Sequence, residues 1–226
     1  MNENRGHVLD ALTAVIINFR TPDLTERAVR TFRKFYPDAQ LMLIDNGSGD
    51  ESATLLRDLR MMNTDRTSVV LNEKNLHHGP AMDQALRLCQ SKFVFFLDSD
   101  CEVKSGGFLE AMVALAEAGE TNYAVGKRIF MNDRGFDVES RPGAHPYIRP
   151  ICMLVRRATY VALPPFERHG APCLANFIAA DRAGFALVHF PVEDYVQHEG
   201  RGTATRHGYG LGLRGRINHL LNRLRL

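Results

Sequence analysis

Two aspartates end an apolar run at residues 93–100, whose sequence is FVFFLDSD. The run is short and aromatic, which indicates a buried β-strand, and residues two apart on an extended chain point the same way. Asp98 and Asp100 would therefore face one side at the exposed end of the strand. Two such carboxylates repel each other unless a cation lies between them, and a hard divalent metal bound by their oxygens could also hold a diphosphate. Alternatively, Asp98 begins a turn and Asp100 caps a helix around Phe108, and a lone D-x-D would favour this second interpretation.

Apolar runs alternate with helix-period stretches through the first half of the sequence, the pattern of a parallel sheet. The expected strands cover 11–17, 41–44, 68–71 and 93–97, with helices after Pro22 and at 80–88, and shorter strands follow at 124–130, 151–155 and 186–190. Such sheets bind ligands beyond the carboxyl ends of their strands. Polar residues stand at three of those ends: Asn18, the run Asp45-Asn46-Gly47-Ser48, and the pair Asp98 and Asp100. We therefore expect an α/β fold with its site along that edge.

The size and composition suit one globular domain. The chain has 226 residues, of which 45 % are hydrophobic and 24 % charged, and its formal net charge of +2 gives no electrostatic reason to expect a nucleic-acid partner. We expect the domain to cover 1–199, and 200–226 to form a Gly-rich flexible segment followed by a short basic amphipathic helix. The helix suits docking on the protein's own body or in a homo-oligomer, with weak membrane-surface contact through 214–226 as the alternative.

The cysteines and the start of the sequence suggest a cytoplasmic location. The four cysteines are scattered without a C-x-x-C pair, which predicts reduced thiols. No basic stretch followed by an apolar one marks a signal peptide, and no apolar run has the length of a membrane span. We therefore predict a cytoplasmic protein.

Four segments, in this order and spacing, resemble the family-2 glycosyltransferases of the GT-A fold. They are AVIINFRTPDLTERAVRTF, LMLIDNGSGDES, NEKNLHHGPAMDQAL and FVFFLDSD, and they extend over about half the chain. The resemblance implies a single GT-A (Rossmann-like) nucleotide-binding domain, with a mixed, mainly parallel central sheet flanked by helices. Residues 11–104 would form the donor-nucleotide half and 105–199 the acceptor half. It also implies sugar transfer from a nucleotide-diphosphate donor, a UDP-sugar by default, to an unknown acceptor that could be a glycan, a lipid-linked group, a protein or a small molecule.

The same resemblance assigns residues to the donor site. Asp45 would accept a hydrogen bond from the base, Asn18 and Asn75 would line the nucleotide pocket, and Asp98 and Asp100 would serve the ribose, the diphosphate and the metal. The whole set expected to bind the nucleotide sugar is Ile17, Asn18, Phe19, Asp45, Asn75, His78, Gly79, Asp83, Asp98 and Ser99. For Asp45 the alternative is a turn residue that organises the next two residues, and both roles could hold at once.

A third metal ligand follows from the end of the core. The segment RAGFALVHFPVEDYVQHEGRGTA is similar to the last core segment of the family, where a histidine before a glycine-bearing stretch can complete the metal site. This implies His198 as a ligand beside Asp98 and Asp100. An imidazole ligand favours Mn²⁺ over Mg²⁺, because Mg²⁺ prefers oxygen and water. The alternative for His198 is a surface polar residue.

The sequence departs from the family at the catalytic base. Inverting relatives carry an acidic pair where this chain reads Gly170-Ala171-Pro172-Cys173, although an inverting transfer needs a group that takes the acceptor's proton. With Asp100 as the other catalytic residue, the candidates for the base are His169 first, and then Glu167, Asp181, Glu193 and Asp194. Each of these could equally be a loop or turn residue. A retaining enzyme would need no such base, so the stereochemical outcome stays open.

Four further side chains could take part in chemistry. Cys173 is expected to be a small core side chain rather than a nucleophile. His77 and His78 follow Asn75 where relatives usually carry small residues, so they could contact the sugar phosphates or cap the next helix. His189 lies in an apolar run and predicts a hydrogen-bonded core histidine.

Other classes of protein fit less well. A haloacid-dehalogenase-type phosphatase would use Asp98 as its nucleophile, but Glu102 stands where such enzymes usually carry Thr or Val, and the motif lies mid-chain. A sugar nucleotidyltransferase would require a glycine-rich basic loop after the first strand, which NFRTPDL lacks. The main alternative is a non-catalytic nucleotide-sugar-binding or scaffolding protein that kept the fold and lost the base.

Overall fold

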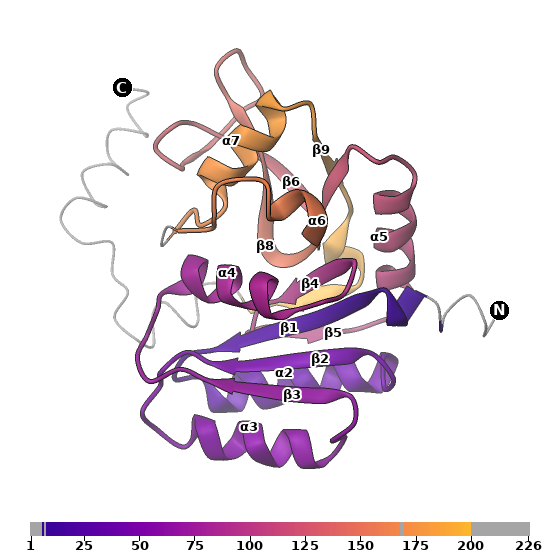
Figure 1. Cartoon of the computed structure of the whole chain (residues 1–226), viewed down its shortest axis with the longest axis vertical. Helices are drawn as coiled ribbons and strands as arrows, with labels where there is room; N and C mark the ends of the chain where they lie inside the picture. The colour runs from indigo at the N-terminus through magenta and orange to yellow at the C-terminus, as the bar shows by residue number, and fades with distance from the viewer. Residues whose placement is uncertain (1–5, 7, 168–169, 200–226) are drawn as a thin grey trace.

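The computed structural model describes residues 6, 8–167 and 170–199, and in this part of the chain the helices cover both faces of one central sheet (Figure 1). Eight described strands form the sheet in the order β3-β2-β1-β4-β8-β6-β7, with β9 paired to β6. They are β1 (Leu12–Asn18), β2 (Gln40–Asp45), β3 (Thr67–Leu71), β4 (Phe93–Leu97), β6 (Asn122–Met131), β7 (Asp137–Val138), β8 (His145–Arg156) and β9 (Ala186–His189). The first four strands run parallel, whereas β8 runs antiparallel to both β4 and β6. The predicted α/β class with a mixed, mainly parallel sheet is therefore confirmed.

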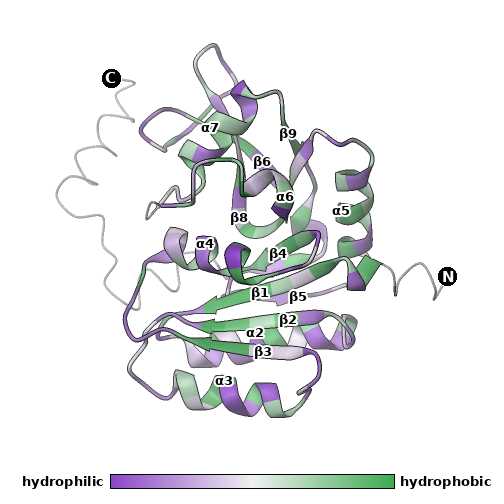
Figure 2. Ribbon diagram, viewed as in Figure 1, coloured by the Kyte–Doolittle hydropathy of each residue, from purple (hydrophilic) through white to green (hydrophobic). Residues whose placement is uncertain are grey.

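Each face of the sheet has its own apolar core. The helices that pack on one face are α2 (Pro22–Phe35), α3 (Ser52–Met61) and α5 (Phe108–Glu117), and those on the other are α4 (His78–Leu88), α6 (Arg157–Tyr160) and α7 (Leu174–Arg182). Every residue of β4 is buried, since its side chains alternate between the two cores. Figure 2 shows mostly hydrophobic residues along β1 and β2 and many hydrophilic ones on α3. The strand that carries the D-x-D is thus fixed from both sides.

The N-terminal half follows the predicted pattern closely. The helix after Pro22 buries Leu24, Ala28, Val29 and Phe32, the residues expected on one face. The predicted strands match β1 to β4, and β4 has the expected limits. Asn18 and Asp45 are the last residues of β1 and β2 rather than the residues after them, because the parallel pairing extends to the register Asn18↔Asp45.

A small second sheet was not expected. It pairs β5 (Cys101–Val103) with β10 (Val196–His198) in antiparallel fashion, and His198 lies opposite Cys101. β5 begins directly after Asp100, so the interpretation of Asp100 as a helix cap is wrong. The next helix begins at Phe108 with Gly107 at its N-cap.

The remaining predictions have mixed outcomes. The four cysteines are free and buried, as the scattered spacing predicted. His189 is hydrogen-bonded, since its Nδ1 accepts from the Arg128 N–H at 3.3 Å, but it is exposed and not a core residue, because it ends β9 beyond the packed interior. The predicted C-terminal segment 200–226 lies outside the described residues. No described helix combines the length and the apolar character needed to cross a membrane.

Candidate functional site

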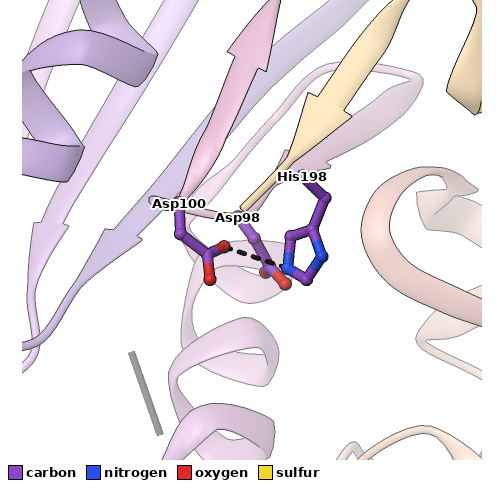
Figure 3. Close-up of side chains that lie close together, drawn as sticks. All are labelled: Asp98, Asp100 and His198. Atoms are coloured by element: carbon purple, nitrogen blue, oxygen red, sulfur yellow. Dashed lines mark ion pairs between the residues drawn. The ribbon is translucent and has the colours of Figure 1, made fainter. Parts of the chain in front are cut away.

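Three side chains at the carboxyl end of the sheet form a candidate metal site. Asp98 follows β4, Asp100 precedes β5, and His198 ends β10, so the small sheet brings the end of the described core to the D-x-D (Figure 3). One potential ligand atom from each residue lies within 4.8 Å of the others. His198 Nε2 is 3.2 Å from Asp100 Oδ1, and Asp100 is buried with 7 % of its surface exposed. The structure thus brings together the three residues expected to bind a metal.

The electrostatics of the cluster suit a divalent cation. Loss of contact with water raises the pKa of Asp98; His78 and His198 lower it, and Asp100 raises it. The hydrogen bond to Asp100 raises the pKa of His198, against the opposing effect of burial. The two adjacent carboxylates repel each other, and a cation between them would relieve that repulsion. Carboxylate oxygens and an imidazole nitrogen are ligands that suit Mn²⁺. The described residues therefore fit a metal ion.

This geometry predicts how metal affinity depends on pH. The pKa of His198 is raised above its ordinary value of 6.5, so the imidazole keeps its proton to a higher pH than in the unfolded chain. Because only the neutral imidazole binds a metal, the proton competes with Mn²⁺ for this residue. We expect Mn²⁺ affinity to rise with pH, by at most about 10-fold per pH unit for this one proton, and to level off only above the raised pKa of His198. Titration calorimetry with Mn²⁺ at several pH values measures the slope.

The metal-free protein should show the opposite trend. The protonated His198 beside Asp100 contributes stability below pH 6.5, and that contribution is lost as pH rises through the raised pKa. His198→Gln is the matched variant, since it removes the titrating group. An equally steep rise of Mn²⁺ affinity in this variant would rule out His198 as the group responsible.

A cavity of about 380 Å³ adjoins the cluster where β1, β2 and β4 end. Its described lining residues are Ile17, Phe19, Asn46, Asn75, His77, His78, Asp98, Ser99, Asp100, Arg149, Pro150, Ile151, Gly170, Pro172 and His198. Most of the residues expected in the donor site are among them, but Asn18, Asp45, Gly79 and Asp83 are not. The volume suits part of a nucleotide sugar.

Asn18 lies behind the lining and joins two turns. It is fully buried, and its Oδ1 accepts from the Thr21 N–H at 3.3 Å and from Thr25 Oγ1 at 2.8 Å. Its Nδ2 donates to Asp45 Oδ1 at 2.9 Å and to Ser48 Oγ at 3.1 Å. The Asp45 carboxylate also accepts from the Ser48 N–H at 3.3 Å and from Ser48 Oγ. The structure therefore shows the turn-organising role of Asp45, and its contact with a base stays a prediction.

Asn46 lines the cavity, whereas the sequence had predicted that its neighbour Asp45 would contact the nucleotide. Its Nδ2 donates to Asn75 Oδ1 at 3.1 Å, and its Oδ1 accepts from Asn72 Nδ2 and the Leu76 N–H, each at 3.1 Å. These bonds connect the turn after β2 to the segment before α4. The sequence named Asn46 only as part of a polar run, because nothing in the run tells which member faces the cavity.

Asp83 and Gly79 belong to the packing of α4 in this structure. Asp83 Oδ1 accepts from Tyr160 OH at 2.6 Å, and this bond links α4 to α6. Asp83 Oδ2 accepts from Arg87 Nε at 2.8 Å within α4. Gly79 is buried within the first turn of α4. Their predicted contact with the donor is not visible in the cavity lining.

The base candidates lie in different places. His169 lies outside the described residues, whereas Gly170 and Pro172 line the cavity. Glu167 and Asp181 are exposed, and Glu193 and Asp194 lie in η1 (Val192–Asp194), where Glu193 pairs with Lys127 at 3.2 Å. None of these four lines the cavity, whose described carboxylates are Asp98 and Asp100. Cys173 is fully buried, and burial raises the pKa of its thiol, which supports a core role.

Solved structures share this architecture at low sequence identity. The mannosyltransferase PcManGT from Pyrobaculum calidifontis, in complex with GDP-Man and Mn²⁺, has a TM-score of 0.67 at 15 % identity and is matched over 96 % of this chain and 64 % of its own. GalNAc-T7 with UDP, GalNAc and Mn²⁺ has a TM-score of 0.68 at 15 % identity, over 83 % and 43 %. TarS 1–349 from S. aureus with UDP-GlcNAc has a TM-score of 0.59 at 15 % identity, over 84 % and 59 %. The fold is therefore that of the GT-A glycosyltransferases, and this chain spans 43 to 64 % of the lengths of these three proteins.

The sequence itself gives the family. Residues 13–177 match the sequence profile of glycosyl transferase family 2, and a search of curated protein sequences finds no significant match. The matched range includes both D-x-D aspartates and ends before His198. The chain belongs to glycosyl transferase family 2.

Proposed function

We propose that this protein transfers a sugar from a nucleotide-diphosphate donor to an acceptor hydroxyl, with a divalent metal held by Asp98, Asp100 and His198. The observation that carries the proposal is the cluster of two carboxylates and an imidazole beside the cavity at the carboxyl ends of β1, β2 and β4. Sheets of this kind place ligands at that edge. A UDP-sugar is the default donor, and Mn²⁺ is the preferred metal, with Mg²⁺ as the alternative.

We assign different parts of the donor to different described residues. Ile17, Phe19, Asn46 and Asn75 line the part of the cavity next to β1 and β2, which suits the nucleoside. Asp98 and Asp100 lie where the diphosphate would bind, and a bound divalent cation would neutralise the charge that develops on the departing nucleotide. Asn18 and Asp45 keep the two turns in place, and contact between Asp45 and the base remains part of the proposal.

Arg149 is a cavity residue that the sequence did not reveal. It lies on β8, its side chain is 35 % exposed, and its Nη2 pairs with the carboxylate of Asp137 on β7. Its positive charge lowers the pKa of His198, and both residues line the cavity, which supports a position near the proposed metal. We propose that Arg149 stabilises the diphosphate of the departing nucleotide.

Removal of this charge gives a test. We expect Arg149→Gln to weaken binding of UDP in the presence of Mn²⁺ by about 10-fold or more, the value of one charge-assisted hydrogen bond. Asp137→Asn is the matched control, because it removes the partner of Arg149 outside the cavity and keeps the arginine. Calorimetry that finds equal UDP affinity in wild type and Arg149→Gln would exclude this role.

The acceptor side of the cavity is also a proposal. We propose residues 105–199 as the acceptor half, which lines the cavity with Pro150, Ile151, Gly170 and Pro172. Arg149 and His198 also come from this half, but we propose that they serve the donor's diphosphate and the metal. His169 remains our first proposal for the base, since its neighbour in sequence lines the cavity, with Asp194 as the alternative. Docking of 214–226 and a cytoplasmic location also remain proposals, the latter supported by four free buried cysteines.

A non-catalytic nucleotide-sugar-binding protein is the second candidate. It is favoured by the described cavity lining, where the carboxylates are the two expected to bind metal. A thermal-shift screen with UDP-, GDP-, dTDP- and CMP-sugars, each with Mn²⁺, Mg²⁺ or chelator, tests for the donor site, because ligands raise apparent stability by mass action. We expect a metal-dependent shift with one nucleotide and release of that nucleotide on incubation. A shift without turnover against any acceptor would favour the second candidate, and no shift would contradict both.

A further inference from the structure

His77 has a backbone conformation that only glycine adopts easily. Its φ is 69° and its ψ is 169°, a combination that brings the side chain of an L-residue into conflict with its own backbone. Among the described non-glycine residues, positive φ occurs at His77 and Arg20. The residue before α4 therefore stores strain that a glycine would not.

The surrounding structure holds His77 in this conformation. Its N–H donates to Asn75 Oδ1 at 2.7 Å, and its carbonyl oxygen accepts from Asn46 Nδ2 at 3.3 Å and from the Ala81 N–H at 3.2 Å. Asn46 is itself buried and bonded to Asn72, Asn75 and Leu76 of the same segment. Both peptide groups next to His77 are thus fixed, which explains how the strain persists.

The position of His77 at the cavity suggests a role in ligand binding. His77 lines the cavity that adjoins the metal site, and its neighbour His78 places Nε2 at 3.8 Å from Asp98 Oδ1. A glycine would allow the same turn at lower conformational cost, so the turn does not explain the imidazole. Strained residues of this kind cluster at ligand sites, where the surrounding structure imposes them.

We infer that His77 is a donor-contacting residue whose imidazole N–H donates a hydrogen bond to the diphosphate of the bound nucleotide. The inference rests on the proposed function, because it needs a diphosphate in the cavity. A neutral imidazole carries one N–H donor and diphosphate oxygens are acceptors, so the contact needs no change of charge. The strained turn brings His77 to the cavity that is also lined by Asp98 and Asp100, which would hold the metal.

The test separates stability from binding. His77→Gly should raise the Tm of the ligand-free protein by about 2–4 °C, because it releases the strain, and should weaken binding of a nucleoside diphosphate with Mn²⁺ by about 10-fold. His77→Ala keeps the Cβ and therefore the strain, so it should weaken binding equally but without the gain in Tm. The control is Glu73→Gly, an exposed residue of the same segment outside the cavity lining and without a positive φ, which should lower Tm slightly and leave binding unchanged.

Thermal unfolding and titration calorimetry with UDP, GDP and dTDP in the presence of Mn²⁺ give distinct outcomes. A higher Tm with unchanged binding in His77→Gly would overturn the inference and leave the proposed function standing. A Tm of His77→Gly no higher than that of His77→Ala would show that the backbone is not strained and would also overturn it. If wild type binds none of the three, both the inference and the proposed function are wrong.

Discussion

Replacing Asp100 by Asn should lower the rate of sugar transfer by about 1,000-fold or more and leave the metal-free protein folded. The loss follows from the proposed metal site, because stabilisation of the departing diphosphate by a cation contributes several kcal/mol and Asp100 is one of the two carboxylates proposed to hold that cation. The metal-free protein should tolerate the change, since it removes one of two negative charges that oppose each other in the cluster. The rise in Tm on addition of Mn²⁺ should disappear.

The measurements are nucleotide release from the sugar donor and thermal unfolding with and without Mn²⁺. Glu102→Gln is the control, because this carboxylate lies on β5 close to the cluster but pairs with Lys104 at 2.7 Å and does not line the cavity. It should retain activity and the Mn²⁺ response. Full activity in Asp100→Asn would exclude the metal site as described, and an unfolded Asp100→Asn would show that Asp100 is structural.

Replacing Gly47 by Ala should destabilise the protein by about 3–5 kcal/mol, an effect as large as the loss of a core side chain. Gly47 has a φ of 73°, and a Cβ there would lie 2.2 Å from the carbonyl carbon of Lys74 and 2.6 Å from the Asn75 nitrogen. These are backbone atoms, so they cannot move aside by a change of rotamer. Because Asn75 lines the cavity, the shift that relieves the clash should also weaken nucleotide binding.

Gly49 provides a matched comparison within the same turn. Its φ is 70°, but a Cβ there would meet no heavy atom within 4 Å, so Gly49→Ala should cost only about 1–2 kcal/mol for the left-handed conformation. Urea unfolding of both variants gives the free energies, and calorimetry with UDP and Mn²⁺ gives the binding. Equal destabilisation in the two variants would contradict the close approach of the turns at Gly47 and Lys74.

The part of the fold that is set by short-range patterns was predictable. The limits of β4 could be read directly, because five buried residues end at a charged pair. The face of α2 followed from the spacing of its apolar residues. α3 was not predicted, and it buries only Ser52, Leu56 and Leu59, so few apolar residues mark its inner face.

The site was predictable only where strand ends define it. Asp98 and Asp100 follow from the D-x-D, but His198 depended on resemblance, because the pairing of β5 with β10 joins residues almost a hundred positions apart. Arg149 was missed for the same reason: it reaches the cavity through β8, whose antiparallel pairing with β4 leaves no local signal in the sequence. Asn18 is fully buried and hydrogen-bonded to both turns, a scaffold role that the sequence did not indicate, and its contact with the nucleotide stays a prediction.

The most direct test of the account is electron–nuclear double resonance of Mn²⁺ bound to the protein with UDP, GDP or dTDP. The account predicts a nitrogen coupling from His198 that disappears in His198→Gln, together with a phosphorus coupling from the diphosphate on the same ion. Mn²⁺ bound without either coupling, or with both unchanged in His198→Gln, would contradict the assignment of Asp98, Asp100 and His198 as the site that holds the donor.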